Sequence, residues 1–288
     1  GTHQAEPMTK KLIIAEKPSV AADIAKALGG FTKHDDYFEN DTHVISSAVG
    51  HLLELSCPEE FEVKRGKWSF AHLPVIPPHF ALSPIEKTES RLKVLNKLIK
   101  RKDVDGLINA CDAGREGELI FNYIAQHSKS GKPVQRLWLQ SMTQGAIRDG
   151  FSRLRPGREM EGLGDAAVCR SESDWLVGIN GTRAMTAFNS KTGGFHLTTV
   201  GRVQTPTLAI VVEREKRIRE FKSRPYWEVE ASFAAKAGDY NGKWFDEAFK
   251  GKNDDEHARA DRLWEEKRAD AIRAATIGKP GIVTEESK

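Results

Sequence analysis

The stretch at residues 107–121, which reads LINACDAGREGELIF, constrains the fold of this chain more than any other segment. Its first five residues have the length and composition of a buried parallel strand, and this apolar run stops at Asp112. Ala113 and Gly114 supply a turn. From Glu116 the apolar residues recur at the spacing of a helix with one buried face. A strand that leads directly into a helix predicts an α/β fold, which places its chemistry at the carboxyl ends of the strands.

A second strand end carries the same kinds of side chain. Residues 11–15, KLIIA, read as an apolar strand, and a helix closed by Gly29 and Gly30 follows shortly after. Acidic residues at a helix start often do no more than complement the helix dipole. Two such ends on neighbouring parallel strands instead predict one crevice, whose carboxylates could hold a hard divalent cation and whose arginine could hold a phosphate. The residues expected in it are Glu16, Lys17, Asp112, Arg115 and Glu116.

The alternation of strand and helix continues to about residue 154 and predicts a mostly parallel sheet covered by helices on both faces. The residues RPG at 155–157 then break the pattern and make a plausible boundary. Thr143 is a good cap for the last helix before that break. The elements expected are strands at 44–49 and 134–139, the second being the last strand of the domain, helices at 89–101 and 143–154, and a long ordered loop or pair of irregular strands at 68–84.

Beyond this boundary the pattern changes twice. Residues 160–187 read as one helix, and Pro206 suits the first turn of another, which Thr205 could cap. From Tyr226 the apolar residues alternate with polar ones, as in a half-exposed strand. Further strands are expected at 244–248 and 281–284, a helix at 256–275, and a turn at Tyr240.

Two motifs in this chain resemble the Toprim domain of type IA DNA topoisomerases. They are the strand-Glu-Lys-Pro-Ser-helix segment near the start and the strand-Asp-x-x-Arg-Glu-Gly-Glu segment about a hundred residues later. Four more segments resemble topoisomerase III, in the same order and at similar spacing: residues 50–54 (GHLLE), 68–77 (WSFAHLPVIP), 174–183 (DWLVGINGTR) and 200–208 (VGRVQTPTL). Because several motifs recur in order from about Lys10 to Glu215, the chain is identified as a member of this family.

The resemblance implies an α/β fold of three parts. A Toprim-type, mostly parallel sheet flanked by helices is expected at residues 9–154, and a helical region that binds single-stranded DNA at 155–220. Residues 221–288 would begin a β-rich domain, the arch that encloses the DNA gate in this family. Residues 1–8, which end at Met8, are expected to be a cloning scar.

The resemblance also implies an activity. Type IA enzymes cut and rejoin one DNA strand without ATP, through a tyrosine that forms a phosphotyrosine ester. That tyrosine lies in a Tyr-x-Arg-Ser/Thr setting, which none of the chain's four tyrosines has: Tyr37, Tyr123, Tyr226 and Tyr240. We therefore expect an N-terminal part of a topoisomerase III, inactive alone because the nucleophile lies beyond Lys288.

Three other functions remain open at this stage. A DNA-binding module without chemistry would also lack the tyrosine. A Toprim nuclease or primase-like enzyme would keep the metal chemistry, although a Toprim domain alone does not require residues 200–206. A metabolic enzyme for a phosphorylated small molecule is the weakest alternative, because no Gly-x-Gly-x-x-Gly motif or P-loop follows any strand.

The resemblance assigns roles in the crevice. Glu16, Asp112 and Glu116 would hold Mg²⁺, and Glu16 would also protonate the leaving 3′ oxygen. Lys17 and Arg115 would stabilise negative charge on the phosphate. One departure stands out, because Toprim domains usually read Asp-x-Asp and the second of these positions is Gly114 here. Glu118 lies on another face of the helix and does not replace it, so a weaker or single metal site is predicted.

A second set of residues is expected to contact DNA. Trp175 could equally be a core residue of a helical bundle, and a lone histidine such as His51 is more often structural. The resemblance favours DNA contact, because bases of any sequence stack on aromatic rings and arginine pairs with phosphate. Gly201 would allow close approach of the backbone. The DNA-binding residues expected are His51, Trp68, Trp175, Arg183, Thr199, Val200, Gly201, Arg202, Val203 and Gln204.

Composition adds only broad limits. The chain has 288 residues, 39% of them hydrophobic and 30% charged, and its net charge of +3 permits a nucleic-acid partner without arguing for one. No apolar run approaches the roughly 20 residues that cross a bilayer, and no secretory signal is present. Cys57, Cys111 and Cys169 show no metal-binding spacing, so reduced thiols are expected. We expect a monomeric bacterial protein of the cytoplasm, associated with the nucleoid, whose partner is single-stranded or underwound duplex DNA.

Overall fold

The structure is a computed structural model that describes residues 9–62, 67–251, 255 and 257–284. The expected cloning scar at residues 1–8 lies outside this part. The chain divides between Ala209 and Ile210 into two units, which are described separately. Among the described residues, the sheet of the first unit has the strand order β2-β3-β4-β1-β7-β8-β9. These strands are β1 (Lys10–Ala15), β2 (Thr32–Lys33), β3 (Phe38–Glu39), β4 (His43–Ser47), β7 (Val104–Ala110), β8 (Val134–Arg136) and β9 (Arg155–Pro156).

The centre of the sheet is parallel, as expected. Strand β1 pairs in parallel with β4 and β7, and β7 pairs in parallel with β8. The outer strands β2, β3 and β9 are antiparallel additions. The prediction that 134–139 is the last strand was wrong, because β9 pairs with β8 at the edge. Pro156 is tolerated there because an edge strand leaves one row of its backbone groups unpaired.

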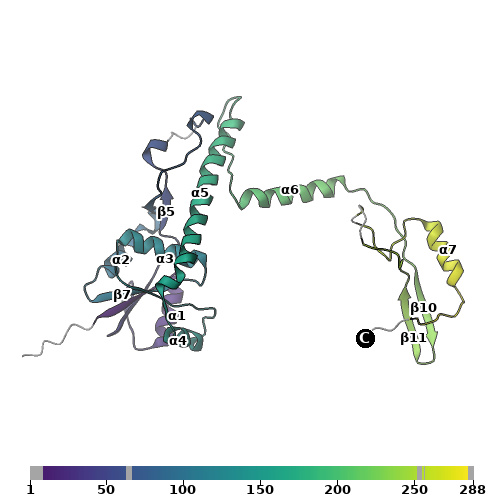
Figure 1. Ribbon diagram of the computed structural model, residues 1–288, viewed down its shortest axis with the longest axis horizontal. Helices are drawn as coiled ribbons and strands as arrows, with labels where there is room; N and C mark the ends of the chain where they lie inside the picture. Colours follow the sequence, from purple (N-terminus) through teal and green to yellow (C-terminus); the bar gives the residue numbers. More distant parts are fainter. Residues whose placement is uncertain (1–8, 63–66, 252–254, 256, 285–288) are drawn as a thin grey trace, which may run out of the picture. The chain divides into compact units, whose positions relative to one another are not determined.

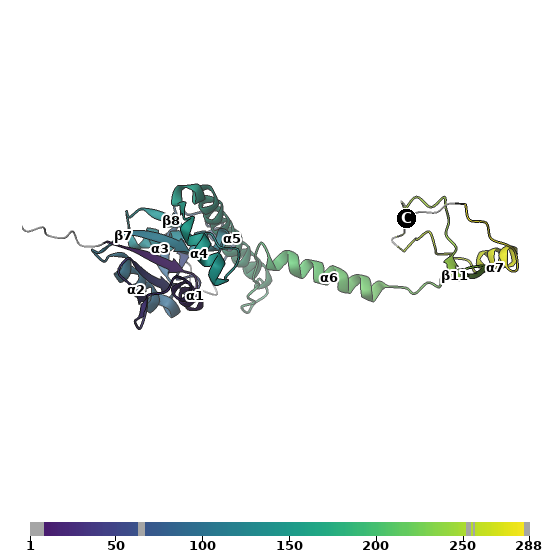
Figure 2. The ribbon, with the colours of Figure 1, turned by 90° about the horizontal axis from the view of Figure 1, so that it is seen from below.

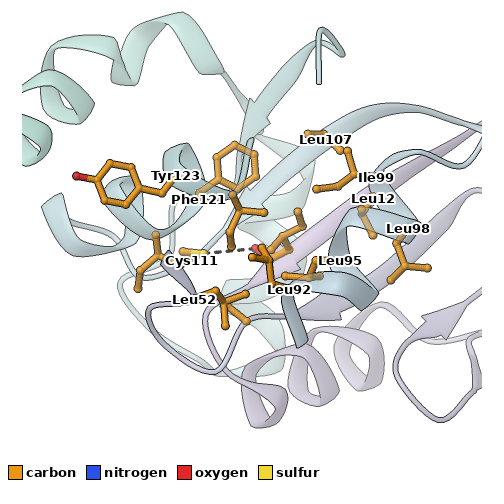
Figure 3. Packing of buried hydrophobic residues seen from close by; sticks show 14 of the residues in the cluster. Leu12, Leu52, Leu92, Leu95, Leu98, Ile99, Leu107, Cys111, Phe121 and Tyr123 are labelled. Carbon is orange, nitrogen blue, oxygen red and sulfur yellow. Dashed lines mark hydrogen bonds between the residues drawn. The ribbon is translucent and has the colours of Figure 1, made fainter. Parts of the chain in front are cut away.

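Helices cover both faces of this sheet (Figure 1). Alternate residues of β1 serve the two faces: Leu12 and Ile14 pack toward α2 and α3, and Ile13 and Ala15 toward α1 and α4. Figure 3 shows the first of these layers, in which the buried thiol of Cys111 lies 3.7 Å from the carbonyl oxygen of Ile14. Burial raises the pKa of that thiol. The helices are α1 (Pro18–Leu28), α2 (Glu89–Ile99), α3 (Arg115–Ser128) and α4 (Gln144–Ser152).

The helix boundaries follow the expected local signals. Gly29 ends α1 with a φ of 72°, and the side chain of Thr143 accepts a hydrogen bond from the backbone N–H of Ala146 at the start of α4. The apolar face of α2 is buried, as predicted. The chain thus presents both strand-to-helix connections of interest, after β1 and after β7, at one end of the sheet.

A long helix, α5 (Glu161–Asn189), extends away from the sheet (Figure 1 and Figure 2). Beside it lies an excursion of the chain between β5 (Leu53–Ser56) and β6 (Ala81–Pro84), which contains the short helices η1 (Glu59–Phe61) and η2 (Phe70–His72). Asn180 fixes this excursion to α5, because its side-chain amide pairs with both the N–H (2.6 Å) and the carbonyl (2.8 Å) of Val75. The segment predicted as a loop or irregular strands is therefore a loop with one short helix and one strand.

The chain returns along α5 before it enters α6 (Gln204–Glu220). Thr186 and Thr182 accept hydrogen bonds through their hydroxyls from the backbone N–H groups of Thr198 and Val200, both at 3.0 Å. A β-carbon at Gly181 would lie 2.7 Å from a methyl carbon of Val200. The glycine therefore lets the returning segment, residues 198–202, lie close against the helix.

The second unit contains the hairpin β10 (Glu230–Ala235) and β11 (Gly238–Lys243), followed by α7 (Glu266–Thr276). The predictions here were the least accurate. Tyr240 lies in β11 and stacks on Phe233, at 5.1 Å between ring centroids, and not in a turn. Residues 244–248 and 281–284 form no strand, and the helix predicted from 256 begins at Glu266. Among the described residues, no helix is long and apolar enough to cross a membrane.

Candidate functional site

The crevice predicted at the strand ends would lie at the carboxyl ends of β1 and β7, beside β4. Ala15 pairs with Ala110 in the parallel register, so Glu16 and Asp112 follow at the same edge of the sheet. The loop after β4 joins them, because the N–H of Ala48 donates to the carbonyl of Ala15 (2.8 Å) and the N–H of Gly50 to that of Glu16 (3.1 Å). Gly50 has a φ of 84°, which favours glycine, and this turn directs His51 toward the crevice.

Two contacts connect the side chains across this crevice. The Nε2 atom of His51 lies 3.0 Å from a carboxylate oxygen of Glu116, at the start of α3. The ammonium group of Lys17 lies 4.0 Å from the carboxylate of Glu16. Asp112 and Arg115 are both exposed. The structure therefore brings His51 to the predicted acidic residues, in a crevice that is open to solvent.

Glu16 differs from the other acidic residues in its burial. Its side chain is only 12% exposed, whereas that of Glu116 is 61% exposed. One of its oxygens, Oε2, is buried without a hydrogen-bond partner among the described residues. Buried polar atoms normally have a partner, so an unpartnered carboxylate oxygen at this strand end fits a cation or a ligand that donates a hydrogen bond.

The complete metal site is less well formed than the resemblance implied. Among the described residues, no group of three His, Cys, Asp or Glu side chains is arranged to hold one metal ion. Gly114 accounts for part of this, because it provides no carboxylate at the position where Toprim domains usually have one. The weaker or single metal site stays a prediction, because the described residues present no such cluster against which to test it.

A buried ion pair beneath the crevice was missed by the sequence reasoning. The guanidinium of Arg136, on β8, donates to Glu118 at 2.6 Å, and both side chains are almost completely buried. Its other N–H groups donate to the carbonyl oxygens of Asn109, Cys111, Leu137 and Asp112, at 2.6–3.1 Å. The signal was a single charged residue, Arg136, in the strand predicted at 134–139, since a buried charge requires a partner.

This pair holds the backbone from which Asp112 projects. Arg136 binds the carbonyl group of Asn109 near the end of β7 and those of Cys111 and Asp112 in the β7-to-α3 connection. Glu118 binds the side-chain amide of Asn109 at 3.2 Å. Gly117 completes the arrangement, because a β-carbon there would lie 2.0 Å from the carbonyl oxygen of Asp112. Glu118 therefore has a structural role, as its predicted orientation away from the metal site suggested.

The two tryptophans predicted to contact DNA lie along α5. Trp175 is half-buried, with its ring 5.5 Å from that of Phe80 in an edge-on contact. It lines a hollow of about 390 Å³ that also includes His51 and Tyr123. Trp68 contacts Phe195 edge-on at 5.9 Å. Trp175 thus lies close to the crevice, on a surface that includes one of its residues.

Arg183 does not occupy the position predicted for it. It is only 7% exposed, and its guanidinium donates to the carbonyl of Phe61 (2.9 Å) and lies 5.7 Å from the ring centre of Trp68. These contacts hold the excursion against α5. We therefore omit Arg183 from the DNA surface proposed below, because its charged group is enclosed by the protein.

Residues 199–204 lie at the junction between the returning segment and α6. Thr199, Arg202, Val203 and Gln204 are exposed, whereas Val200 and Gly201 are partly buried. Asp174 on α5 anchors this segment through a 2.8 Å ion pair with Arg202. The helix begins at Gln204, two residues earlier than predicted, so Thr205 lies inside the first turn and accepts a hydrogen bond from the N–H of Gly201.

Two segments of this chain match known protein families. A family model described as Toprim domain matches residues 11–142, and one described as DNA topoisomerase matches residues 158–287. The chain is 43% identical over 225 residues to DNA topoisomerase 3 of Bacillus cereus and 42% identical over 226 residues to that of Bacillus subtilis. In both cases the match covers 78% of this chain and 30% of the relative. The chain therefore spans about a third of the length of these curated relatives.

A solved structure supports the same fold. The full-length topoisomerase I of Thermotoga maritima resembles this chain with a TM-score of 0.55 and 18% identity, over 91% of this chain and 37% of that one. At this identity the likeness concerns the fold alone. The two family models, the relatives and the fold agree, and the chain belongs to the type IA DNA topoisomerase family, with topoisomerase III among its relatives.

Proposed function

We propose that this chain forms the acidic part of an active site that cuts and rejoins one strand of DNA without ATP. The observation that carries the proposal is the buried, unpartnered carboxylate oxygen of Glu16 at the joined ends of β1 and β7. It lies in the crevice that also holds Lys17, Asp112 and the contact between His51 and Glu116. A buried acid beside a cationic side chain, open to a polyanion, suits chemistry on a phosphodiester.

The residues of the crevice take the following roles in this proposal. Glu16 gives a proton to the 3′ oxygen that leaves when the strand is cut, and takes it back when the strand is rejoined. Lys17 and Arg115 bind the phosphate oxygens and stabilise their negative charge. His51 holds Glu116 in position through their 3.0 Å contact.

Mg²⁺ is the cofactor that this donor set fits best, since hard cations prefer carboxylate oxygens. Glu16, Asp112 and Glu116, which are not gathered around one point in the structure, would have to move together to hold it, and it would supply positive charge beside the phosphate. The orphaned oxygen of Glu16 supports this assignment. Because Gly114 offers no ligand, one weakly held ion is proposed and not two.

Single-stranded or underwound duplex DNA is the proposed partner. Trp175 and the exposed residues among 199–204 would contact the strand next to the crevice. The nucleophilic tyrosine is not identified in this chain: Tyr123 is 5% exposed and its hydroxyl contacts Ser171, and no tyrosine lies in the expected setting. A monomer that acts in the bacterial cytoplasm near the nucleoid belongs to the same proposal, and the three unpaired cysteines suit a reducing compartment.

The test combines DNA binding with metal binding. The chain is incubated with a labelled single-stranded oligonucleotide, with and without Mg²⁺, and run on native and denaturing gels. A shifted band on the native gel and intact DNA on the denaturing gel are expected. Calorimetry should show a heat of Mg²⁺ binding that Glu16→Gln and Asp112→Asn remove and that Asp149→Asn, an exposed carboxylate on α4, retains.

Two results would contradict the proposal. Mg²⁺-dependent shortening of the DNA, abolished by Asp112→Ala, would indicate a Toprim nuclease. The absence of any shift, together with the absence of Mg²⁺ binding, would show that the crevice has neither function.

A further inference from the structure

Two exposed phenylalanine rings lie against the same lysine, which follows the C-terminal end of α5. This part of the chain is remote in sequence from the crevice. Phe70, on η2, is 52% exposed and Phe188, in the last turn of α5, is 54% exposed. The ammonium group of Lys191 lies 5.4 Å from the ring centre of Phe70 and 4.7 Å from that of Phe188. These three residues are called the aromatic patch below. Large exposed rings around a cation are unusual on a protein surface and indicate a binding function.

The patch is built on a fixed framework. The N–H of His196 donates to the hydroxyl of Ser190 (3.1 Å), and the side-chain amide of Asn189 donates to the hydroxyl of Thr198 (2.7 Å). These bonds close the loop that follows α5. On the other side, the double hydrogen bond between Asn180 and Val75 holds the segment that follows η2. The two rings thus come from parts of the chain that are far apart in sequence and are held together.

The two stretches of sequence that supply the patch contain no acidic residues, although Glu60 lines a hollow together with Ala71 and His72, next to Phe70. The chain contains 41 aspartates and glutamates, yet none occurs at residues 63–85 or at residues 175–212, the two segments that supply the patch. The same segments contain lysines and arginines, including Lys67, Lys191 and Arg202. An aromatic surface in a segment with cations and without acids is complementary to a polyanion that carries flat apolar groups.

We propose that the aromatic patch binds single-stranded DNA by stacking bases on Phe70 and Phe188 while Lys191 pairs with a phosphate. This proposal rests on the proposed function for the nature of the ligand, but concerns a site outside the crevice and outside residues 199–204. Since Lys191 contacts both rings, a phosphate bound to it would bring its own base beside them. Every base has a face that can stack, so binding here would be independent of sequence.

Photocrosslinking gives the most direct test. A single-stranded oligonucleotide of thymidine in which some positions are replaced by 5-iodouracil is bound to the whole chain and irradiated, and the protein is digested with trypsin. Crosslinks are expected in the peptides 68–87 and 184–191, which contain Phe70 and Phe188. Crosslinks confined to other peptides would overturn the proposal.

A binding titration by fluorescence anisotropy supplies the energetic test. The double variant Phe70→Ala, Phe188→Ala should bind the oligonucleotide about a hundredfold more weakly, because each of the two lost stacks is worth a factor of about ten. Phe245→Ala, at a residue that is 58% exposed in the second unit, is the matched control and should leave binding unchanged. Lys191→Gln should lower the salt dependence by about one phosphate contact, whereas Lys26→Gln, on the surface of α1, should not.

The same titration separates this inference from the proposed function. Arg115→Ala removes a cation from the crevice and leaves the patch intact. If the unaltered chain binds and Arg115→Ala weakens binding while the patch variants do not, the patch proposal fails and the proposed function stands. If the patch variants alone weaken binding, the patch proposal stands and the crevice lacks its assigned contact.

Discussion

Gly114 is the residue at which the candidate metal site can be improved by one substitution. Its φ of 168° is ordinary extended backbone, and a β-carbon there would meet no atom within 4 Å. Aspartate should therefore fit without strain. We predict that Gly114→Asp binds Mg²⁺ more tightly, on the order of tenfold, because a second carboxylate two residues after Asp112 adds charge and a ligand at the same strand end.

Isothermal titration calorimetry measures this change directly. Gly145→Asp is the matched control, since this glycine in α4 also has open space and lies outside the crevice. Its affinity for Mg²⁺ should equal that of the unaltered chain. An affinity of Gly114→Asp no higher than that of the control would show that metal does not bind at the end of β7.

Arg136 is the residue on which the framework of the crevice most depends. Arg136→Met would leave the charge of Glu118 buried without its partner, and would free the carbonyl groups of the β7-to-α3 connection. We predict a loss of about 3–5 kcal/mol in the free energy of unfolding of the first unit. Denaturant unfolding, followed through the fluorescence of the neighbouring Trp138, measures it.

The double variant Arg136→Met, Glu118→Leu is the control for this interpretation. A buried ion pair replaced by apolar side chains is often neutral in stability, so the double variant should recover most of the loss. A double variant as unstable as Arg136→Met alone would mean that the hydrogen bonds to the backbone carbonyls, and not the unpaired charge, dominate.

At the scale of elements, two glycines of α5 differ in what they meet. A β-carbon on Gly181 would lie 2.7 Å from a methyl carbon and 2.9 Å from the β-carbon of Val200, whereas one on Gly178 would meet only a carbonyl oxygen at 3.9 Å. We predict that Gly181→Ala displaces the returning segment and weakens binding of single-stranded DNA several-fold. Gly178→Ala should keep binding and stabilise the helix by up to about 1 kcal/mol, because alanine has the higher helix propensity.

Thermal melting and anisotropy titrations of the two variants test this pair. Both substitutions add one methyl group to the same helix, so any difference between them arises from Val200. Equal DNA binding by the two variants would show that the position of residues 198–202 does not matter for the DNA contact.

The elements around the crevice could be predicted because each has a strong local signal. Apolar strands that end before Glu16 and Asp112, and the glycine that closes α1, identified both strand ends and their shared edge. The contact of His51 with Glu116 could not be predicted, since it depends on a loop that folds back after β4. Arg136 was missed because the pattern of a strand shows that a residue lies in the sheet, but not which distant carbonyl groups it binds.

The second strand of the hairpin in the second unit was missed for a related reason, whereas the first was expected from Tyr226 onward and begins at Glu230. Strand β11 is exposed at five of its six positions, and its sequence lacks the alternation of apolar and polar residues that marks a half-buried strand. Tyr240 and the polar residues beside it resemble a turn in sequence, yet they pair with β10 through the backbone and through the ring of Phe233. The polar residues therefore indicated a turn where the chain forms a strand, because β11 has almost no buried positions that would give its sequence an alternating pattern.

At the scale of the whole chain, the two units differ greatly in how much they bury. Among the described residues after Ile210, the buried hydrophobic side chains are Leu263 and Ala269, whereas the first unit has two extensive apolar layers. Local stability follows buried apolar contact, so we predict that the amides of β11 exchange with deuterium much faster than those of β7, as observed by mass spectrometry. Strand β7 is buried at six of its seven positions, and serves as the internal reference. Equal protection of the two strands would mean that the second unit is stabilised by something other than its own core.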